Sequence, residues 1–389
     1  MPIINRLAEF QNDIVAWRHD FHRHPEILYE VHRTAAAVAA RLREFGVDEV
    51  VTGLGRTGVV GVIRGRNAGT GRTIGLRADM DALPILETTG KDYASAEAGK
   101  MHACGHDGHT AMLLGAARYL AETRNFDGTA VVIFQPAEEG GGGGRAMVED
   151  GLMDRFAIDE VYGLHNMPGL PIGHFAIRPG PIMAATDEFN IEITGLGGHA
   201  AKPHVTIDPI VAGAQLINAL QTIVSRSVDP IEAAVVSVTR FNAGQAHNII
   251  PGGARLGGTV RTLLPELRDL AEVRIKAIAD GIALATGARI VVDYDRNYPV
   301  TVNHVAQTAF AVGVAGAVAG AAHVDDNVAP MMGGEDFSYM LEARPGAFIF
   351  MGNGDSAGLH NSDYDFNDEA IPVGASYLAK LVETALAPA

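Results

Sequence analysis

The 389-residue sequence contains a single cysteine, Cys104. One cysteine cannot form an intramolecular disulfide, so a disulfide framework is excluded and a reducing compartment is expected. The side chain of Cys104 is then a small buried hydrophobic group, a reactive thiol or a metal ligand. The residue by itself leaves these three alternatives open.

Positive charge is also scarce. The chain has 30 Lys and Arg residues against 46 Asp and Glu residues, which gives a formal net charge of −16 and an isoelectric point near 5.3. A protein that grips phosphate backbones needs a basic surface. We therefore expect no nucleic-acid partner.

Segments typical of export or membrane insertion are lacking. Residues 1–17 carry Glu9 and Asp13 in an amphipathic pattern and show none of the features of a signal peptide. The alanine-rich run 311–322 is interrupted by glycine and is shorter than the roughly 20 residues that span a bilayer. We expect a cytoplasmic protein with no membrane partner.

The composition is that of a folded protein, with 47% hydrophobic and 20% charged residues. Single hydrophobic cores stop growing beyond about 250–300 residues. A chain of 389 residues is therefore expected to form two domains.

Strands and helices alternate in the first and last parts of the chain. Helices are predicted from Leu7 to Phe21, from Thr34 to Phe45 and around 110–123, and buried strands at 59–63, 73–78, 130–134, 161–164 and 347–351. This order predicts an α/β domain, residues 1–185 and 298–389, with a mixed, largely parallel sheet flanked by helices.

Residues 186–297 have a different pattern. Phe189, Ile191 and Ile193 alternate with polar residues, as in a strand with one solvated face. A helix at 208–226, strands at 233–241 and 254–263, a helix at 265–285 and a strand at 289–294 follow. The order βαββαβ predicts an inserted, smaller α+β domain.

Several polar side chains are predicted to lie beyond the carboxyl ends of strands, where open α/β sheets keep their active sites. They are Asp79 and Asp81, the pair Glu138 and Glu139, His165 and His360. Asp79 could orient a metal-bound histidine, which usually needs a carboxylate or carbonyl partner.

The segment 101–109, MHACGHDGH, offers one thiol, three imidazoles and one carboxylate before a helix. This is the ligand set of a transition metal such as zinc, although a polar loop with a chance cysteine has the same composition. Glu138 and Glu139 directly follow a buried strand, where adjacent carboxylates repel each other unless a cation lies nearby. One could bind a metal while the other takes a proton from water, but a solvated turn is the simpler alternative.

The glycine run 140–144 is not a phosphate loop, because no Gly-Lys-Ser/Thr follows it. A flexible loop or a close backbone approach fits better. In the inserted domain, His199 follows a glycine-rich turn and could stabilise an oxyanion, and Arg261 could bind a carboxylate in bidentate fashion. Simple solvent exposure is the alternative for both residues and for Asn248.

Taken together, these residues resemble a family of dinuclear metallohydrolases that includes hippurate hydrolase, N-acyl-L-amino-acid amidohydrolases and auxin-conjugate hydrolases. The resemblance spans nearly the whole chain. It is carried by residues 21–26, 76–84, 102–109, 135–140, 197–204 and 332–337 and by the His360 loop.

The resemblance implies two divalent metal ions, manganese or zinc, with cobalt or nickel also compatible. Their ligands would be Cys104, His106, Glu139, His165 and His360, with Glu138 as general base and acid. It also implies that residues 186–297 form a lid that joins two subunits in a homodimer, or in a tetramer. His199 would then serve the partner's active site, while Asn248 and Arg261 would hold the substrate's free carboxylate.

Two positions depart from the wider superfamily. Arg77 stands where many relatives carry a histidine ligand, and Cys104 stands where others use an aspartate that bridges the metals. Both departures match the hippurate hydrolase branch. They leave the preferred metal open, because thiolate favours soft ions such as zinc while carboxylate and imidazole tolerate manganese.

The expected reaction is hydrolysis of the amide bond of an N-acyl-L-amino acid by a metal-activated water, with Glu138 as general base. A metallo-carboxypeptidase or dipeptidase acting on short peptides is an alternative. A metal-free hydrolase with Cys104 as nucleophile, assisted by His106 or His109, is another. The third is a metal-binding or ligand-binding protein without catalysis. The acyl group and the amino acid stay open.

Overall fold

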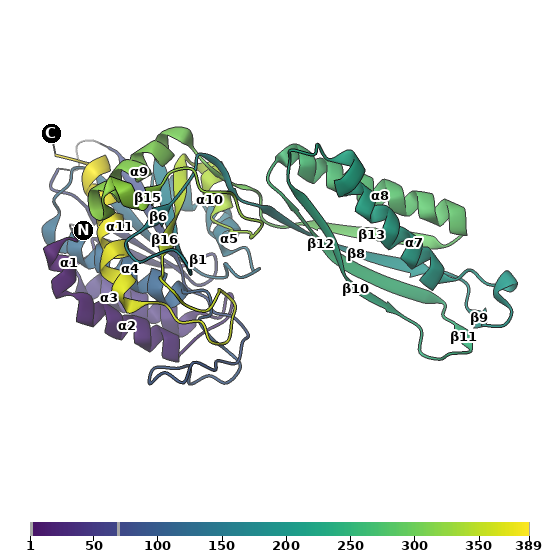
Figure 1. Cartoon of the computed structure of the whole chain (residues 1–389). Helices are drawn as coiled ribbons and strands as arrows, with labels where there is room; N and C mark the ends of the chain where they lie inside the picture. The colour runs from purple at the N-terminus through teal and green to yellow at the C-terminus, as the bar shows by residue number, and fades with distance from the viewer. Residues whose placement is uncertain (1–2, 68–70, 389) are drawn as a thin grey trace. The chain divides into compact units, whose positions relative to one another are not determined.

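The computed structural model describes residues 3–67 and 71–388 of the chain. They divide into two compact units, coloured along the chain in Figure 1. The first unit comprises Met1–Ile182, Thr301–Ala329 and Asp336–Ala389, and the second comprises Met183–Val300 and Pro330–Glu335. The sequence predicts a single inserted segment at 186–297, so the contribution of Pro330–Glu335 to the second unit has no counterpart in that prediction.

In the first unit, eight strands of the described chain form one mixed sheet with the order β1-β2-β4-β3-β5-β16-β6-β15. The strands are β1 (Glu49–Leu54), β2 (Gly58–Arg64), β3 (Thr73–Asp79), β4 (Thr129–Gln135), β5 (Glu160–Met167), β6 (Phe175–Ala176), β15 (Val324–Asp325) and β16 (Gly346–Gly352). The central strands β4, β3, β5 and β16 run parallel, while β1, β2 and β6 add antiparallel pairs. The predicted α/β class with a largely parallel sheet is confirmed.

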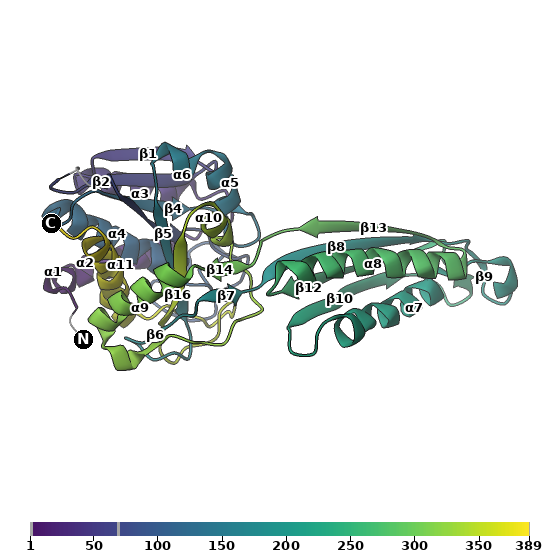
Figure 2. The same cartoon turned by 90° about the horizontal axis from the view of Figure 1, so that it is seen from above.

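Helices cover this sheet on both sides, as Figure 2 shows. They are α1 (Asn5–Glu9), α2 (Gln11–Arg23), α3 (His32–Glu44), α4 (His106–Thr123), α5 (Gly143–Glu149), α6 (Leu152–Arg155), α9 (Val305–Ala319), α10 (Ser338–Ala343) and α11 (Ile371–Ala385), with the 3-10 turns η4 (Ala321–His323) and η5 (Asp368–Ala370). Helix α4 packs against the central strands and against α2 and α11. Residues 106–117 of α4 are all buried, so the first turns of this helix have no solvated face.

Two helix predictions need correction. The helix expected from Leu7 to Phe21 is divided at Phe10 into α1 and α2. The helix expected to start near Thr110 begins at His106, because Gly105 adopts a left-handed conformation (φ 87°) that turns the chain into the helix. His106 and His109 therefore lie in the first turn of α4 and not in a loop.

The carboxyl ends of the parallel strands meet at one edge of the sheet. Asp79, the last residue of β3, is paired in register with Gln135, the last residue of β4. The expectation that His165 follows its strand is wrong, because pairing with β16 extends β5 to Met167 and places His165 inside the strand. The same edge still collects the polar side chains.

The second unit is a four-stranded antiparallel sheet in the order β10-β12-β8-β13, with α7 and α8 lying along one face in Figure 1. Its described elements are β8 (Ala185–Thr194), β9 (Gly198–His199), η2 (Pro203–Val205), α7 (Pro209–Thr222), the π segment η3 (Ile223–Ser227), β10 (Ala234–Ala243), β11 (Ile249–Ile250), β12 (Gly253–Thr262), α8 (Pro265–Thr286) and β13 (Arg289–Arg296). An apolar core that includes Phe189, Ile191 and Ile193 of β8 lies between the sheet and the two helices. The role of this unit as a lid or dimerisation domain stays a prediction.

Two further strands, β7 (Gly180–Met183) and β14 (Thr301–Asn303), pair with each other. Within the described residues, every helix is either too short or too polar to cross a membrane.

Candidate metal centre and active site

His106 lies at the centre of a cluster of polar side chains at the carboxyl edge of the sheet. Its Nδ1 atom lies 2.8 Å from the backbone carbonyl of Asp81, to which it donates. Its Nε2 atom is buried without a hydrogen-bond partner in the described chain. That atom lies 3.7 Å from Asp79 Oδ2 and 3.9 Å from an oxygen of each of Glu138 and Glu139. An imidazole whose Nδ1 is fixed by a backbone carbonyl and whose Nε2 faces carboxylates is placed as a metal-binding histidine is.

Cys104 and His165 form the second part of the cluster. The Sγ atom of Cys104 lies 3.4 Å from His165 Nε2, and His165 Nδ1 lies 2.7 Å from the backbone carbonyl of Asn166. A backbone carbonyl therefore fixes the tautomer of His165 as it does that of His106, and leaves Nε2 to face the thiol.

Glu139 and His360 complete the set. His360 Nε2 lies 3.4 Å from Glu139 Oε1, and the backbone of His360 is in the left-handed region (φ 62°). The backbone amide of His360 donates to the carbonyl of Ala103 at 2.8 Å, which ties the His360 loop to the segment before Cys104. His360 is about half exposed, so this side of the cluster faces solvent.

The donor atoms of the five predicted ligands fall into overlapping groups. Within each group the atoms lie within 4.8 Å of one another: Cys104 with His106 and His165, Cys104 with Glu139 and His360, and His106 with Glu138 and Glu139. Two atoms bound to one zinc ion at about 2.0–2.3 Å lie roughly 3.3–3.8 Å apart. The separations of 3.4 Å between Cys104 Sγ and His165 Nε2 and between His360 Nε2 and Glu139 Oε1 fall within this range.

The charges in the cluster also fit a cation. Burial lowers the pKa of His106, but Asp79, Asp81 and Glu139 outweigh burial and raise it to about 10. Burial opposes ionisation of Glu139, but His360 and His106 lower its pKa below the usual value. Burial and the neighbouring His109 lower the pKa of His165, so its imidazole is neutral, the form that binds metals.

Cys104 lies in the wrong electrostatic environment for a free nucleophile. Burial raises the pKa of its thiol well above the ordinary value, and Glu139, Glu138 and Asp79 raise it further. Reactive cysteines need positive surroundings that favour the thiolate. In this site a bound cation would supply that charge, which favours the metal-ligand alternative over the nucleophile.

Asp79 is placed differently from the expectation. Its Oδ1 atom accepts a hydrogen bond from His109 Nδ1 at 2.7 Å, and His109 Nε2 in turn accepts from the backbone amide of Asn166 at 3.0 Å. The histidine that Asp79 orients is therefore His109, which is not among the predicted ligands. The other oxygen of Asp79 accepts from Arg77 Nη1 at 2.7 Å.

Sequence reasoning missed the buried residues that support the cluster. Asn166 donates to the carbonyl of Cys104 at 2.6 Å and accepts from the Tyr364 hydroxyl at 2.7 Å. Arg77 reaches Asp336 at 3.1 Å as well as Asp79, so it offsets two buried carboxylates. Only their positions next to predicted site residues in the sequence could have indicated these roles.

A second buried network lies at the start of α4. Asp107 Oδ2 accepts from Arg18 at 2.8 Å and from His22 at 2.8 Å. Burial lowers the pKa of His22, but Asp107 and Glu87 outweigh it and raise that pKa to about 9. This ion-pair network ties α2 to the helix that carries His106.

The three site residues predicted in the inserted domain all lie in the second unit. His199 on β9 pairs in register with Ile249 on β11, and the carbonyl of Asn248 accepts from the amide of Ala200 at 3.0 Å. The structure therefore brings His199 and Asn248 together, and both are exposed.

Arg261 lies apart from these two residues, on β12. Its guanidinium donates to the carbonyl of Val260 at 3.1 Å and to the hydroxyl of Thr259. It is half-buried, and burial lowers its pKa. Among the described residues, no carboxylate lies within ion-pair distance of it.

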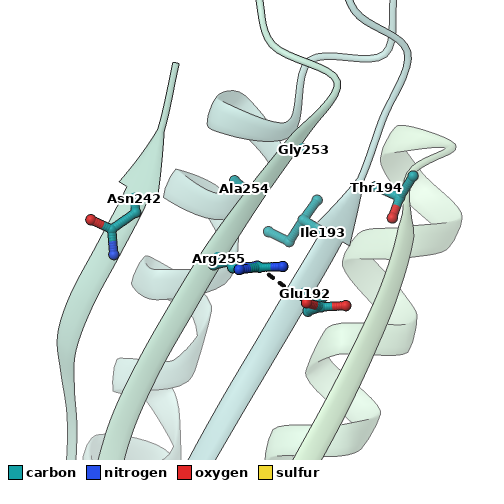
Figure 3. Close-up of a pocket in the computed structure, with 7 residues that line it drawn as sticks. All are labelled: Glu192, Ile193, Thr194, Asn242, Gly253, Ala254 and Arg255. Atoms are coloured by element: carbon teal, nitrogen blue, oxygen red, sulfur yellow. Dashed lines mark ion pairs between the residues drawn. The ribbon is translucent and has the colours of Figure 1, made fainter. Parts of the chain in front are cut away.

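Two hollows in the second unit hold none of the predicted site residues. One, of about 310 Å³, is lined by Glu192, Ile193, Thr194, Asn242, Gly253, Ala254 and Arg255, as Figure 3 shows. Its charged side chains, Glu192 and Arg255, already pair with each other at 3.2 Å. The other, of about 530 Å³, is lined by Asn242, Ala243, Gly244, Gln245, Ala246, Ile249, Pro251 and Gly253.

Comparison with known proteins identifies the family. The family model described as "Peptidase family M20/M25/M40" matches residues 75–384. The chain belongs to this peptidase family. It is 45% identical over 381 residues to "Hippurate hydrolase" from Campylobacter jejuni, with 98% of each chain covered. It is 39% identical over 381 residues to "Thermostable carboxypeptidase 2" from Saccharolobus solfataricus, with 95% of each chain covered.

A solved structure of a Bacillus subtilis protein, described as a dinuclear metal binding peptidase from the M20 family, is similar throughout. It has a TM-score of 0.85 and 35% sequence identity, and the match covers 97% of this chain and 99% of that one. This M20 chain is thus a metal-binding hydrolase that acts on amide bonds, and its metals are divalent.

Proposed function

We propose that the chain hydrolyses the amide bond between an acyl group and an L-amino acid that keeps a free carboxylate. The observation that carries this proposal is the buried Glu138, whose Oε2 lies 3.9 Å from His106 Nε2 beside a cluster suited to metals. A structural metal site needs ligands but has no use for a second carboxylate beside them. The name of the hippurate hydrolase relative supports the substrate class, because hippurate is an N-acylated glycine.

Two divalent metals would be held by Cys104, His106, Glu139, His165 and His360, with manganese or zinc as the first candidates and cobalt or nickel also compatible. When bound, such metals lower the pKa of water and polarise a carbonyl oxygen. The mixed donor set of one thiolate, three imidazoles and one carboxylate fits either zinc or manganese.

Glu138 is the proposed proton carrier of the reaction. Its carboxylate would take a proton from the attacking water and later deliver it to the amine of the departing amino acid. The side chain is 7% exposed, so the proton moves within a largely buried site. Asp79, which accepts from Arg77 at 2.7 Å, lies 3.7 Å from the same His106 Nε2 atom that Glu138 faces.

The second unit would supply the remaining contacts. Arg261 is the proposed anchor for the substrate carboxylate, since it is half-buried and has no carboxylate within ion-pair distance in the described chain. Asn248 would add a hydrogen bond, and His199 would stabilise the oxyanion of the tetrahedral intermediate. We propose that the unit also joins two copies of the chain in a homodimer, in which His199 serves the partner's site.

A carboxypeptidase that releases the last residue of a short peptide is the second candidate. The 39% identical carboxypeptidase relative favours it. The two reactions share the amide, the free carboxylate and every residue role given above. They differ in whether the acyl group is itself an amino acid, which a panel of benzoyl, acetyl and aminoacyl substrates would decide.

The test is the substitution Glu138→Gln, which keeps the size of the side chain and removes its proton affinity. We expect kcat on an N-acyl amino acid to fall by about 10²–10⁴-fold, the usual contribution of a general base, with unchanged metal content by elemental analysis. Glu149→Gln, at an exposed carboxylate paired with Arg145, is the matched control and should keep full activity. Full activity of Glu138→Gln with bound metal would refute the assignment.

A further inference from the structure

The carboxylate of Asp81 holds the turn that carries the Glu138–Glu139 pair. Asp81 Oδ1 accepts from the backbone amide of Glu138 at 2.9 Å, and Oδ2 accepts from the backbone amide of Glu139 at 3.1 Å. Asp81 is 1% exposed, so water does not compete for these two acceptors. One buried carboxylate thus fixes the orientation of two successive peptide groups.

The conformation of Ala137 makes this grip possible. Ala137 is fully buried and has a φ of 54°, in the left-handed region that alanine rarely adopts. A left-handed residue in a turn lets successive backbone N–H groups converge on one anion. The turn is closed by hydrogen bonds from Gly140 to the Glu138 carbonyl at 2.7 Å and from Gly143 to the Ala137 carbonyl at 3.0 Å.

Asp81 also contacts the other half of the site through its main chain. Its carbonyl accepts from His106 Nδ1 at 2.8 Å and so sets the direction of His106 Nε2. The residues on either side of it are anchored, since Met80 donates to Gln135 and Ala82 donates to Glu26, each at 2.8 Å. Asp81 therefore fixes the position of His106 relative to Glu138 and Glu139.

We infer that Asp81 is the positioning residue that assigns separate duties to Glu138 and Glu139. With both peptide groups held, an oxygen of each carboxylate lies 3.9 Å from His106 Nε2, and Glu139 Oε1 also lies 3.4 Å from His360 Nε2. This inference rests on the proposed roles of the two glutamates. Asp81 acts through the residues that it holds, the glutamate pair and His106, and is therefore a positioning residue.

The test is Asp81→Asn, which keeps the shape of the side chain but turns one of its two acceptors into an NH2 donor facing a backbone amide. We expect kcat on an N-acyl amino acid to fall by about 10²-fold, the typical effect of displacing a catalytic group by about 1 Å. KM should stay within about threefold of wild type, because the substrate contacts are unchanged. Metal content after loading is measured in the same samples.

Hydrogen exchange provides a readout that does not depend on activity. In the metal-free chain, the amides of Glu138 and Glu139 should exchange more slowly in wild type than in Asp81→Asn. Asp208→Ala is the matched control, since the Asp208 carboxylate also accepts from two successive amides, those of Ile210 at 2.8 Å and Val211 at 3.4 Å. It should lose protection at those two amides and keep wild-type kcat.

Unchanged kcat in Asp81→Asn would overturn the inference, and so would a loss of activity no larger than the fraction of unfolded protein explains. Faster exchange at Glu138 and Glu139 with unchanged kcat would show a merely structural contact and would also overturn it.

If Asp81→Asn does not fold, Asp81→Glu decides: the longer carboxylate displaces the pair, so kcat should fall while KM holds. A wild-type chain without amidohydrolase activity would refute the proposed function instead, and unaltered exchange in Asp81→Asn would still refute the grip of Asp81 on the turn.

Discussion

At the scale of single residues, the chemistry of this M20 chain depends on how a few buried groups hold their protons. The imidazoles of His106 and His165 each donate one N–H to a backbone carbonyl and present the other nitrogen to the cluster. The thiol of Cys104 stays protonated when carboxylates alone surround it. Metal binding must therefore release protons from the site.

The pH dependence of metal binding follows from these groups. Burial and neighbouring carboxylates raise the pKa of Cys104, and the carboxylates raise that of His106 to about 10. Both groups lose a proton when they bind a metal, so apparent affinity should rise with pH between about 6 and 9, by about tenfold per unit for each proton released. Titration of the metal-free chain with zinc in a competing chelator, at several pH values, measures this slope.

Cys104→Ser is the companion variant, because a hydroxyl binds soft metals less well than a thiolate. It should weaken zinc binding and flatten the slope, and added metal should restore part of the activity. Loss of activity that no metal concentration restores, together with wild-type metal binding, would favour the thiol nucleophile after all.

At the scale of elements, the start of α4 decides where the metal ligands lie. Gly105 begins the helix with φ 87°, and a Cβ atom added there would lie 2.3 Å from Asn166 Nδ2 and 2.5 Å from the Tyr364 hydroxyl. Sequence periodicity placed this helix start four residues late, because the apolar pattern begins only after the buried histidines. The buried polar groups that extend α4 are visible only once β5 and the 360–366 loop pack against it.

We predict that Gly105→Ala lowers the free energy of unfolding more than a Gly→Ala substitution at another glycine with a left-handed backbone. The left-handed backbone costs a non-glycine residue about 1–2 kcal/mol, and the clash with Asn166 and Tyr364 adds roughly 1–3 kcal/mol of overpacking. Gly99→Ala is the matched control, since Gly99 has φ 79° and nothing within 4 Å of its added Cβ. Urea denaturation gives the free energy of unfolding of both variants. The difference between the two losses of stability is the contribution of the clash with Asn166 and Tyr364. Equal destabilisation would contradict the placement of Asn166 against Gly105.

At the scale of the whole molecule, the sequence predicted the α/β class and the two-part organisation of the chain, because strand and helix periods are strong local signals. It also predicted a ligand set whose members the structure does bring together: Cys104, His106, Glu139, His165 and His360. It could not predict the Asp81 contact or the left-handed Ala137. Both depend on how β3 and β4 end beside each other, which no local pattern encodes.

The roles of His199, Asn248 and Arg261 depend on assembly and can be tested by mixing two inactive variants. If His199 serves the partner's site, a chain carrying Glu138→Gln still supplies a good His199, and a chain carrying His199→Asn still supplies a good Glu138. Random exchange of subunits would make about half of the dimers mixed, each with one complete site, and so restore about a quarter of wild-type activity. Each variant is first measured alone, and subunit exchange is confirmed by native mass spectrometry. Mixed dimers without activity would show that His199 serves its own chain or none, while a monomer at working concentration would refute the proposed pairing altogether.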